Sequence, residues 1–197
     1  MILRLSGFLL TKSHEALLVY LFPLRVFTTP IINAPLEKVW KVTAIDFDKV
    51  DEWSSGVSAS GIADGDAPTD EAEMGGRFCM TAYGKCFEMF ESFDEAAHTF
   101  TYKAQFENTI PGVKRASNTW RLEAISDAQT RFSMTSQTEL NVFPGLLMRI
   151  PFRFQIPRVL NMNLEEAKHF IETGKPHPRK VEAMQKVTNS VSSPSTI

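Results

Sequence analysis

Between residues 56 and 143, apolar and polar side chains alternate with a period of two. This is the pattern of strands that bury one face and leave the other in solvent. Most of the connections between these strands are short turns, so we expect antiparallel hairpins rather than parallel crossovers. A β-prone segment at 23–33 predicts one further strand. The six strands after it are expected at 56–64, 76–84, 85–94, 98–106, 118–125 and 130–143.

Two short segments between the first and second strands follow a helical period instead. Residues 33–42 and 46–53 each carry an apolar stripe, which ends at Trp40 in the first and at Trp53 in the second. Asp46 is the cap candidate of the second helix. Helices of this length are marginal in water, so both tryptophans are expected to pack against a larger element.

The helical period returns at Gly145 and predicts one long carboxy-terminal helix that ends at Gly174. Pro151 and Pro157 should kink or break its first half. An antiparallel sheet cannot leave its apolar face open. If the sheet curls, this helix can cover its concave side while the two short helices close one end. The stripe of the second half of the helix consists of Leu160, Leu164, Ala167 and Ile171.

The length of 197 residues predicts one domain, which we place at 23–180. Residues 1–22 form an arm of uncertain structure, because their apolar runs are interrupted by "TKSHE" and match neither a signal peptide nor a membrane span. Residues 181–197 lack a sustained period and are expected to be a disordered tail.

Composition narrows the classes of partner. The formal net charge is -2, so no overall field attracts the chain to nucleic acid or to an anionic membrane. The 15 phenylalanines and 8 methionines suit a large, adaptable apolar interior. That interior could enclose a ligand or be a plain core.

The two cysteines, Cys79 and Cys86, lie in one predicted hairpin. A turn centred on Tyr83 and Gly84 would place Cys86 opposite Thr81, which makes a disulfide unfavourable. No metal-ligand spacing such as C-x-x-C occurs. We interpret both as reduced thiols, which predicts a cytoplasmic protein.

The segments "INAPLEKVW" (32–40), "GGRF" (75–78), "FTYKA" (100–104), "NTWRLEA" (118–124) and "LEEAKHFIETGKPHPRK" (164–180), with Trp53, carry a resemblance. Over about residues 30–180 the chain resembles the SRPBCC superfamily, the START-like helix-grip proteins that include polyketide cyclases, lipid-transfer domains and birch-pollen-type allergens. The resemblance implies an α+β helix-grip fold, in which a seven-stranded curved antiparallel sheet wraps around the long helix. It implies an apolar cavity between helix and sheet, but no fixed catalytic residues, because the fold hosts carriers, receptors and unrelated enzymes.

Candidate ligand contacts come from the predicted strands and the long helix. An inward-facing Arg77 could hold a carboxylate or enolate of a ligand. Strand alternation also allows an outward arginine, as it does for Arg121. Apolar stripes with a few hydroxyl and amide groups suit a pocket lining, although a filled core would look the same. The candidates are Arg77, Phe90, Phe100, Asn118, Trp120, Met134, Ser136, Met148 and Phe152.

Proton-transfer chemistry would need a pocket-facing acid or base with a shifted pKa. Glu88, Tyr102 and Tyr83 are the best-placed candidates for a catalytic residue. The sequence contains none of the common catalytic or nucleotide-binding motifs, so we expect no cofactor and no metal.

Two further segments have more than one interpretation. The acidic stretch 64–73 is expected to be a solvated loop that could gate a cavity. The segment 145–160 mixes arginines with bulky apolar residues and could touch a membrane surface. The preferred interpretation is that its apolar residues roof the cavity and its arginines extend into solvent.

These observations predict a monomer or homodimer that binds a hydrophobic or aromatic small molecule or a lipid, without nucleic acid and without stable membrane insertion. It would be a carrier or a cofactor-independent polyketide-cyclase-like enzyme. The alternative from another class is a receptor-like module whose loops at 65–75 and 107–117 close on the ligand and bind a partner without catalysis.

Overall fold

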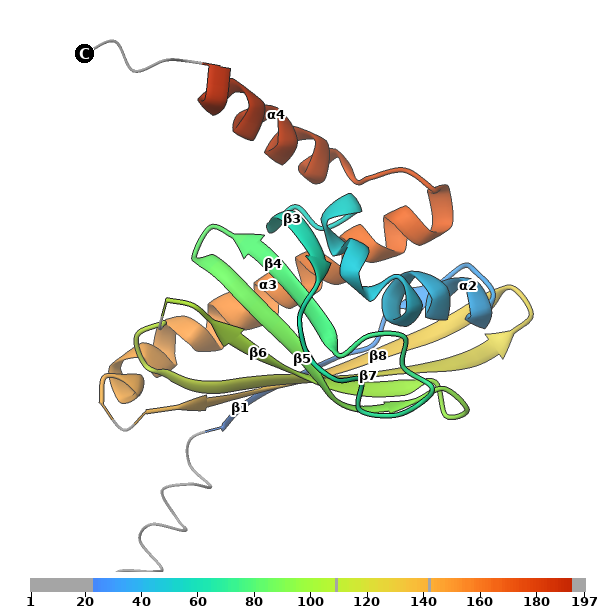
Figure 1. Cartoon of the computed structure of the whole chain (residues 1–197), viewed down its shortest axis with the longest axis horizontal. Coiled ribbons are helices and arrows are strands. Elements are labelled where there is room, and N and C mark those ends of the chain that lie inside the picture. The colour runs from blue at the N-terminus through green and yellow to red at the C-terminus, as the bar shows by residue number, and fades with distance from the viewer. Residues whose placement is uncertain (1–22, 109, 142, 193–197) are drawn as a thin grey trace, which may run out of the picture.

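The computed structural model describes residues 23–108, 110–141 and 143–192 (Figure 1). It is an α+β structure in which one antiparallel sheet curves around a long helix. The elements in chain order are β1 (Pro23–Thr28), β2 (Ile31–Ile32), α2 (Leu36–Trp40), η1 (Lys41–Ile45), η2 (Phe47–Glu52), β3 (Val57–Ile62), β4 (Gly76–Thr81), β5 (Gly84–Asp94), β6 (Thr99–Phe106), β7 (Val113–Ser126), β8 (Gln129–Leu140), α3 (Gly145–Thr173) and α4 (Pro178–Ser192).

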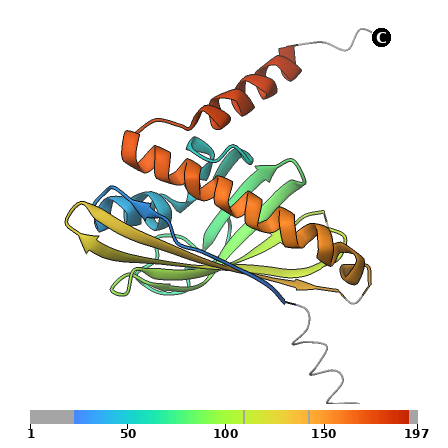
Figure 2. The same ribbon diagram turned by 180° about the vertical axis from the view of Figure 1, so that it is seen from behind.

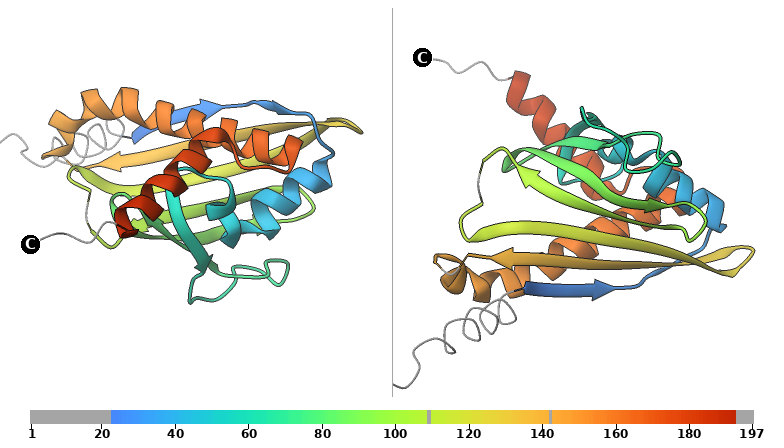
Figure 3. Two further views of the ribbon diagram at one scale, coloured as in Figure 1. Left: turned by 90° about the horizontal axis from the view of Figure 1, so that it is seen from above. Right: turned by 60° about the horizontal axis from the view of Figure 1, so that its bottom comes forward.

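The sheet is a meander closed at one edge by the first strand. Its order is β1-β8-β7-β6-β5-β4-β3, and the short β2 also pairs with β8. α3 crosses the concave face and packs chiefly along β1, β2 and β8 (Figures 2 and 3). The predicted α+β helix-grip class and the antiparallel order are therefore confirmed. The segment 23–33 differs in detail, because it is divided into β1 and β2.

The β4–β5 hairpin has a different register from the one expected. Thr81 pairs with Gly84, so the turn is centred one residue earlier than predicted, and Cys79 lies directly opposite Cys86. The expectation that Cys86 faces Thr81 is wrong, because a one-residue change in the turn shifts every cross-strand pair. Both cysteines are nevertheless free thiols, and both are buried.

The carboxy-terminal helices also depart from expectation. α3 is one continuous helix through Pro151 and Pro157, so the prolines do not break it. Its end follows the prediction, because Gly174 adopts a left-handed conformation with φ of 70° and donates its N–H to the Phe170 carbonyl at 2.7 Å. Residues 178–192 form α4, where the sequence had suggested a disordered tail from 181. Val181, Met184 and Val187 recur at helical spacing on α4, but all three are exposed.

The two predicted short helices form a chain of three shorter turns, α2, η1 and η2. They are stable because they pack on the sheet. Trp40 and Trp53 are buried in one continuous hydrophobic core. The Trp40 ring lies 5.2 Å from the ring of Phe93 and 5.8 Å from that of Phe100. Asp46 precedes η2 as expected, but its carboxylate pairs with Lys41 and Lys49 instead of capping the helix.

A buried carboxylate fixes α3 and α4 to the start of β3. Glu166 is fully buried and accepts hydrogen bonds from the Ser55 backbone N–H at 2.8 Å and from the Ser55 hydroxyl at 2.7 Å. Its third donor is the Nε of Arg179, at 2.8 Å. Beside it, the buried Lys180 donates to the Val57 carbonyl at 2.7 Å. Each charge in this corner therefore has a specific partner, as buried charges require.

We expect Glu166→Ala to lower the free energy of unfolding by about 3 kcal/mol, because it leaves the partly buried Ser55 donors and the Nε of Arg179 without their acceptor. Glu165→Ala is the matched control, since Glu165 also pairs with Arg179 but its side chain is 63% exposed. This change should cost less than about 0.5 kcal/mol. Urea unfolding of both variants measures the difference, and equal effects would contradict a structural role for Glu166.

Candidate functional site

On the concave face of the sheet, the side chains of β6, β7 and β8 differ in size from one end of these strands to the other. Cross-strand register groups the inward residues of these strands into three rows. The first row contains large apolar side chains, the second contains polar tips, and the third contains small side chains. In order, the rows are Phe100, Trp120 and Met134; Tyr102, Asn118 and Ser136; Ala104, Ala116 and Thr138.

The end of the face that holds the first row is filled. Phe100, Phe132 and Phe47 are fully buried there, and ring centroids lie within about 5–6 Å of one another. The predicted contacts Phe90, Phe100, Trp120 and Met134 all belong to this aromatic core. These residues therefore pack α2, η1 and η2 against the sheet.

The opposite end of the same face is open. Ala104, Ala116 and Asn118 point to the concave side, yet each is only half-buried. The reason is the position of α3, which lies over β1 and β8 rather than over β6 and β7. Met148 is half-buried and Phe152 is buried, so the first half of α3 presents these two predicted contacts toward the sheet. We call this incompletely covered part of the concave face, beside the aromatic core, the hollow.

The middle row and the neighbouring Trp120 of the first row carry side-chain polar atoms that have no hydrogen-bond partner in the described structure. The Oδ1 atom of Asn118 and the Nε1 atom of Trp120 are buried and have no hydrogen-bond partner in the described structure. The Tyr102 and Ser136 hydroxyls also make no hydrogen bond within the described part of the chain, but they are not among its fully buried unpaired atoms. Buried polar groups are normally paired, and an unpaired one invites a functional explanation. Three of these four groups come from neighbouring positions on adjacent strands.

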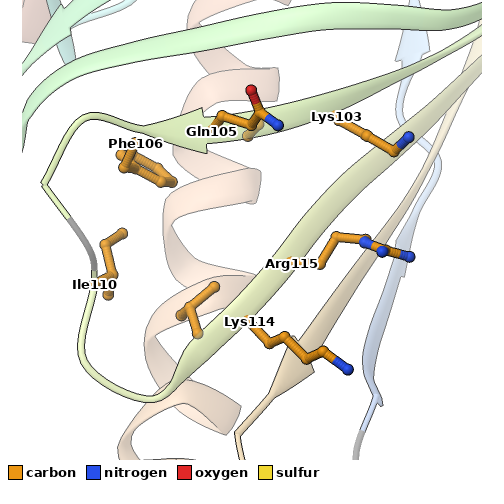
Figure 4. A pocket seen from close by; sticks show the side chains of 8 residues that line it. Lys103, Gln105, Phe106, Ile110, Lys114 and Arg115 are labelled. Atoms are coloured by element: carbon orange, nitrogen blue, oxygen red, sulfur yellow. The ribbon is translucent and has the colours of Figure 1, made fainter.

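A pocket of about 540 Å³ adjoins the hollow where β6 and β7 separate (Figure 4). Pairing between the two strands stops at Ala104 and Ala116, while β6 continues along β5 and β7 along β8. The resulting slit has an apolar inner part and a cationic rim. Its lining consists of Lys103, Ala104, Gln105, Phe106, Ile110, Val113, Lys114 and Arg115.

On the other side of the polar row lies a buried ion pair. Arg77 faces inward, which decides between the two orientations that the sequence allowed, and only 4% of it is exposed. Its Nε donates to Oε2 of Glu88 at 2.6 Å, and its Nη1 donates to the Phe47 carbonyl at 2.7 Å. The guanidinium carbon also lies 3.8 Å from the centre of the Phe47 ring. Arg77 is therefore occupied by the protein itself and is not a free anchor for a ligand carboxylate.

The catalytic candidates occupy three different environments. Glu88 uses Oε2 for Arg77, whereas its Oε1 makes no hydrogen bond within the described part of the chain. Burial raises the pKa of the Tyr102 hydroxyl well above its ordinary value, and the nearby Glu88 charge acts in the same direction. Tyr102 is therefore a neutral hydroxyl that can donate or accept a hydrogen bond but cannot act as a base near pH 7. Tyr83 lies at the tip of the β4–β5 hairpin and is 68% exposed, so the expectation that it faces a pocket is wrong.

Sequence reasoning missed the residues that make the hollow. Ala104 and Thr138 lie on the apolar stripes that suit a pocket lining but were not chosen as ligand contacts, and Ala116 was not considered, because small side chains on a strand give no signal of their own. Lys103 and Lys114 were missed because the opening of the β6–β7 pair depends on register. A metal site has no support in the part of the chain that is described, where no group of three His, Cys, Asp or Glu residues comes together.

Comparison with known proteins identifies the fold and its family. The sequence matches the family model described as polyketide cyclase / dehydrase and lipid transport over residues 24–164. The chain belongs to this family. No match is found among curated proteins.

Solved structures of low sequence identity share the family's fold. A protein of Bacillus thuringiensis is 15% identical with a TM-score of 0.58, covering 75% of this chain and 98% of its own. The ZhuI aromatase/cyclase from Streptomyces sp. R1128 is 15% identical with a TM-score of 0.55, covering 79% of this chain and 99% of its own. The norcoclaurine synthase of Thalictrum flavum is 9% identical with a TM-score of 0.57, covering 76% and 94%. At these identities the similarity concerns the fold alone.

We expect Arg77→Ala to destabilise the protein by about 3 kcal/mol, because it leaves the Glu88 carboxylate and the Phe47 carbonyl without their donor. Arg121→Ala is the matched control, since the Arg121 side chain is 64% exposed and pairs only with a surface glutamate. Its effect should stay below about 0.5 kcal/mol. Equal losses in urea unfolding would show that the Arg77–Glu88 pair contributes no more than a surface contact.

Burial raises the pKa of both Cys79 and Cys86 from 9.0 to about 12. A thiol whose pKa is higher in the folded than in the unfolded state stabilises the protein below the unfolded pKa and loses that contribution as pH rises. The free energy of unfolding should therefore fall between about pH 9 and pH 12. Urea unfolding across this range measures the slope, which should be shallower in a Cys79→Ala, Cys86→Ala variant. An unchanged slope would mean that other groups, such as Tyr102, cause the loss of stability at alkaline pH.

Proposed function

We propose that this protein binds a hydrophobic or aromatic small molecule that carries a polar group, in the hollow between β6, β7 and α3. The single observation that supports this proposal is the row of Tyr102, Asn118 and Ser136, which are paired in register on adjacent strands and include the buried, unpaired Oδ1 atom of Asn118. A ligand hydroxyl or carbonyl would meet both a donor and an acceptor in this row. Its apolar part would rest against Met148, Phe152 and the edge of the aromatic core.

The chemistry of the row favours holding a ligand over transforming it. All three side chains are uncharged, and the raised pKa of Tyr102 keeps its proton in place. Small-molecule sites typically combine such a mostly apolar wall with a few placed polar groups, in a volume of roughly 300–1,000 Å³. The slit between β6 and β7, which includes Ala104 of the third row, supplies a space of this size. A carrier function therefore has the stronger support.

Cyclase-like catalysis is the second candidate, and the observation that favours it is the free oxygen of Glu88. Glu88 is paired in register with Ala104 of the third row, one strand away from the hollow. A carboxylate there could accept a proton from a bound chain while Tyr102 donates a hydrogen bond to the developing oxyanion. The family description includes cyclases and dehydrases as well as lipid transport.

The first experiment is native mass spectrometry of the purified full-length chain, followed by titration with a fluorescent apolar probe. Ala116→Trp should fill the hollow and lower probe affinity at least about tenfold, because the large ring occupies the ligand volume. Ser117→Trp is the control, since it places the same side chain on the opposite face of the same strand. Circular dichroism and thermal unfolding should show that both variants are folded.

The outcomes separate the proposals. A wild-type chain that neither carries a ligand nor takes up the probe would mean that the hollow is not a binding site. Equal affinity in the Ala116→Trp and Ser117→Trp variants would place binding elsewhere. Once a ligand is identified, Glu88→Gln distinguishes the two functions, because a carrier should bind it as before and a cyclase should lose turnover.

A further inference from the structure

The first half of α3 leaves a stripe of large apolar side chains in solvent. Phe143, Leu147, Ile150 and Phe154 are 78%, 67%, 72% and 71% exposed. The last three recur at spacings of three and four residues, so they share one face of the helix, and Phe143 directly precedes it. We call these four residues the α3 stripe. The expectation that the apolar residues of this segment roof a cavity is therefore wrong for the stripe, whereas Met148 and Phe152 lie on the less exposed side of the helix.

Packing within the described part of the chain does not account for the α3 stripe. Phe152, on the other face of the same helix, is 9% exposed and already supplies the contact with the sheet. Single exposed apolar residues are ordinary, but a continuous row of large ones marks an interaction surface.

The charged residues along the first half of α3 all have one sign. No aspartate or glutamate occurs from residue 140 to residue 164, whereas Arg149, Arg153 and Arg158 lie in this interval. A helix that combines an apolar face with flanking arginines is the form that lies in the interface of an anionic bilayer. A second copy of the chain fits less well, because a two-fold contact through this helix would bring its arginines together.

The α3 stripe lies at the same end of the molecule as the slit. The Asn141 N–H, just before α3, donates to the Gly112 carbonyl in the β6–β7 connection at 2.9 Å. In Figures 1 and 3 the start of α3 and this connection lie at one end of the sheet. A surface that binds the stripe would therefore also lie next to the cationic rim of the slit.

We propose that the α3 stripe docks the protein on the surface of a membrane that contains anionic lipid. The helix lies in the plane of the interface, with its apolar side chains among the acyl chains and its arginines at the lipid phosphates. This is peripheral binding, since no helix in the described part of the chain combines the length and hydropathy needed to cross a bilayer. The proposal does not depend on the ligand that occupies the hollow.

The test is co-sedimentation of the full-length chain with vesicles of phosphatidylcholine alone and of phosphatidylcholine with about one third phosphatidylglycerol. The wild-type chain should bind the anionic vesicles, more weakly as salt is raised, because screening weakens the arginine–phosphate attraction. A Leu147→Ser, Ile150→Ser, Phe154→Ser variant should lose affinity at least about tenfold. Arg153→Gln with Arg158→Gln should lose the preference for anionic over neutral vesicles.

The control variant removes three exposed apolar side chains elsewhere, Ile62→Ser, Val181→Ser and Met184→Ser, which are 61%, 40% and 55% exposed. It should bind as the wild type does. Failure of the wild type to bind, an undiminished stripe variant, or an equal loss in the control would each overturn the proposal. A wild-type dimer and a monomeric stripe variant in light scattering, without vesicle binding, would also overturn the proposal. The stripe would then join two copies of the chain.

Discussion

The buried contact between Arg77 and Glu88 is the interaction on which the interior depends. Arg77 joins three elements at once, because it belongs to β4, binds Glu88 of β5 and holds the carbonyl of Phe47 in η2. Removing a guanidinium from water is costly unless its donors are satisfied. Here a carboxylate, a carbonyl and the face of an aromatic ring satisfy it together. The pair therefore fixes the short helices to the sheet at the boundary between the filled and the open half of the concave face.

The division into two halves follows from side-chain volume and from the path of α3. Where the inward residues of β6, β7 and β8 are large, they fill the space below the short helices. Where the inward residues are alanine and threonine, α3 lies chiefly over β1, β2 and β8. Between these halves lies the row of Tyr102, Asn118 and Ser136, whose side-chain polar groups make no hydrogen bond within the described part of the chain. A fold that hosts carriers and enzymes can change its ligand through such rows while its aromatic core remains constant.

The two proposals assign two different functions to the same end of the molecule. The hollow would hold the ligand, and the α3 stripe would bring the slit to a lipid surface. The stripe is exposed because α3 has a full helical circumference and the sheet can bury only one side of it. Apolar residues on the outer side need a separate physical reason, and the arginines beside them indicate an anionic surface.

Much of the architecture was determined by local patterns that the sequence displays by itself. Period-two alternation located the six strands of the meander, the apolar stripes located the short helices and α3 but not α4, and Gly174 marked the end of α3. These signals are local, since each depends on residues within a few turns or one hairpin. Glu88, Tyr102, Asn118 and Ser136 were also recognisable as candidates, because polar residues on mostly apolar strand faces stand out in the sequence.

The remaining features were decided by tertiary structure. A shift of one residue in the β4–β5 turn put Cys79 opposite Cys86 and turned Arg77 toward Glu88, and no local pattern specifies such a shift. The hollow exists because α3 passes over β8 rather than β7, which is a matter of long-range packing. Tyr83 and the α3 stripe face solvent for the same reason, because the sequence shows which residues are apolar but not which side of an element the rest of the protein covers.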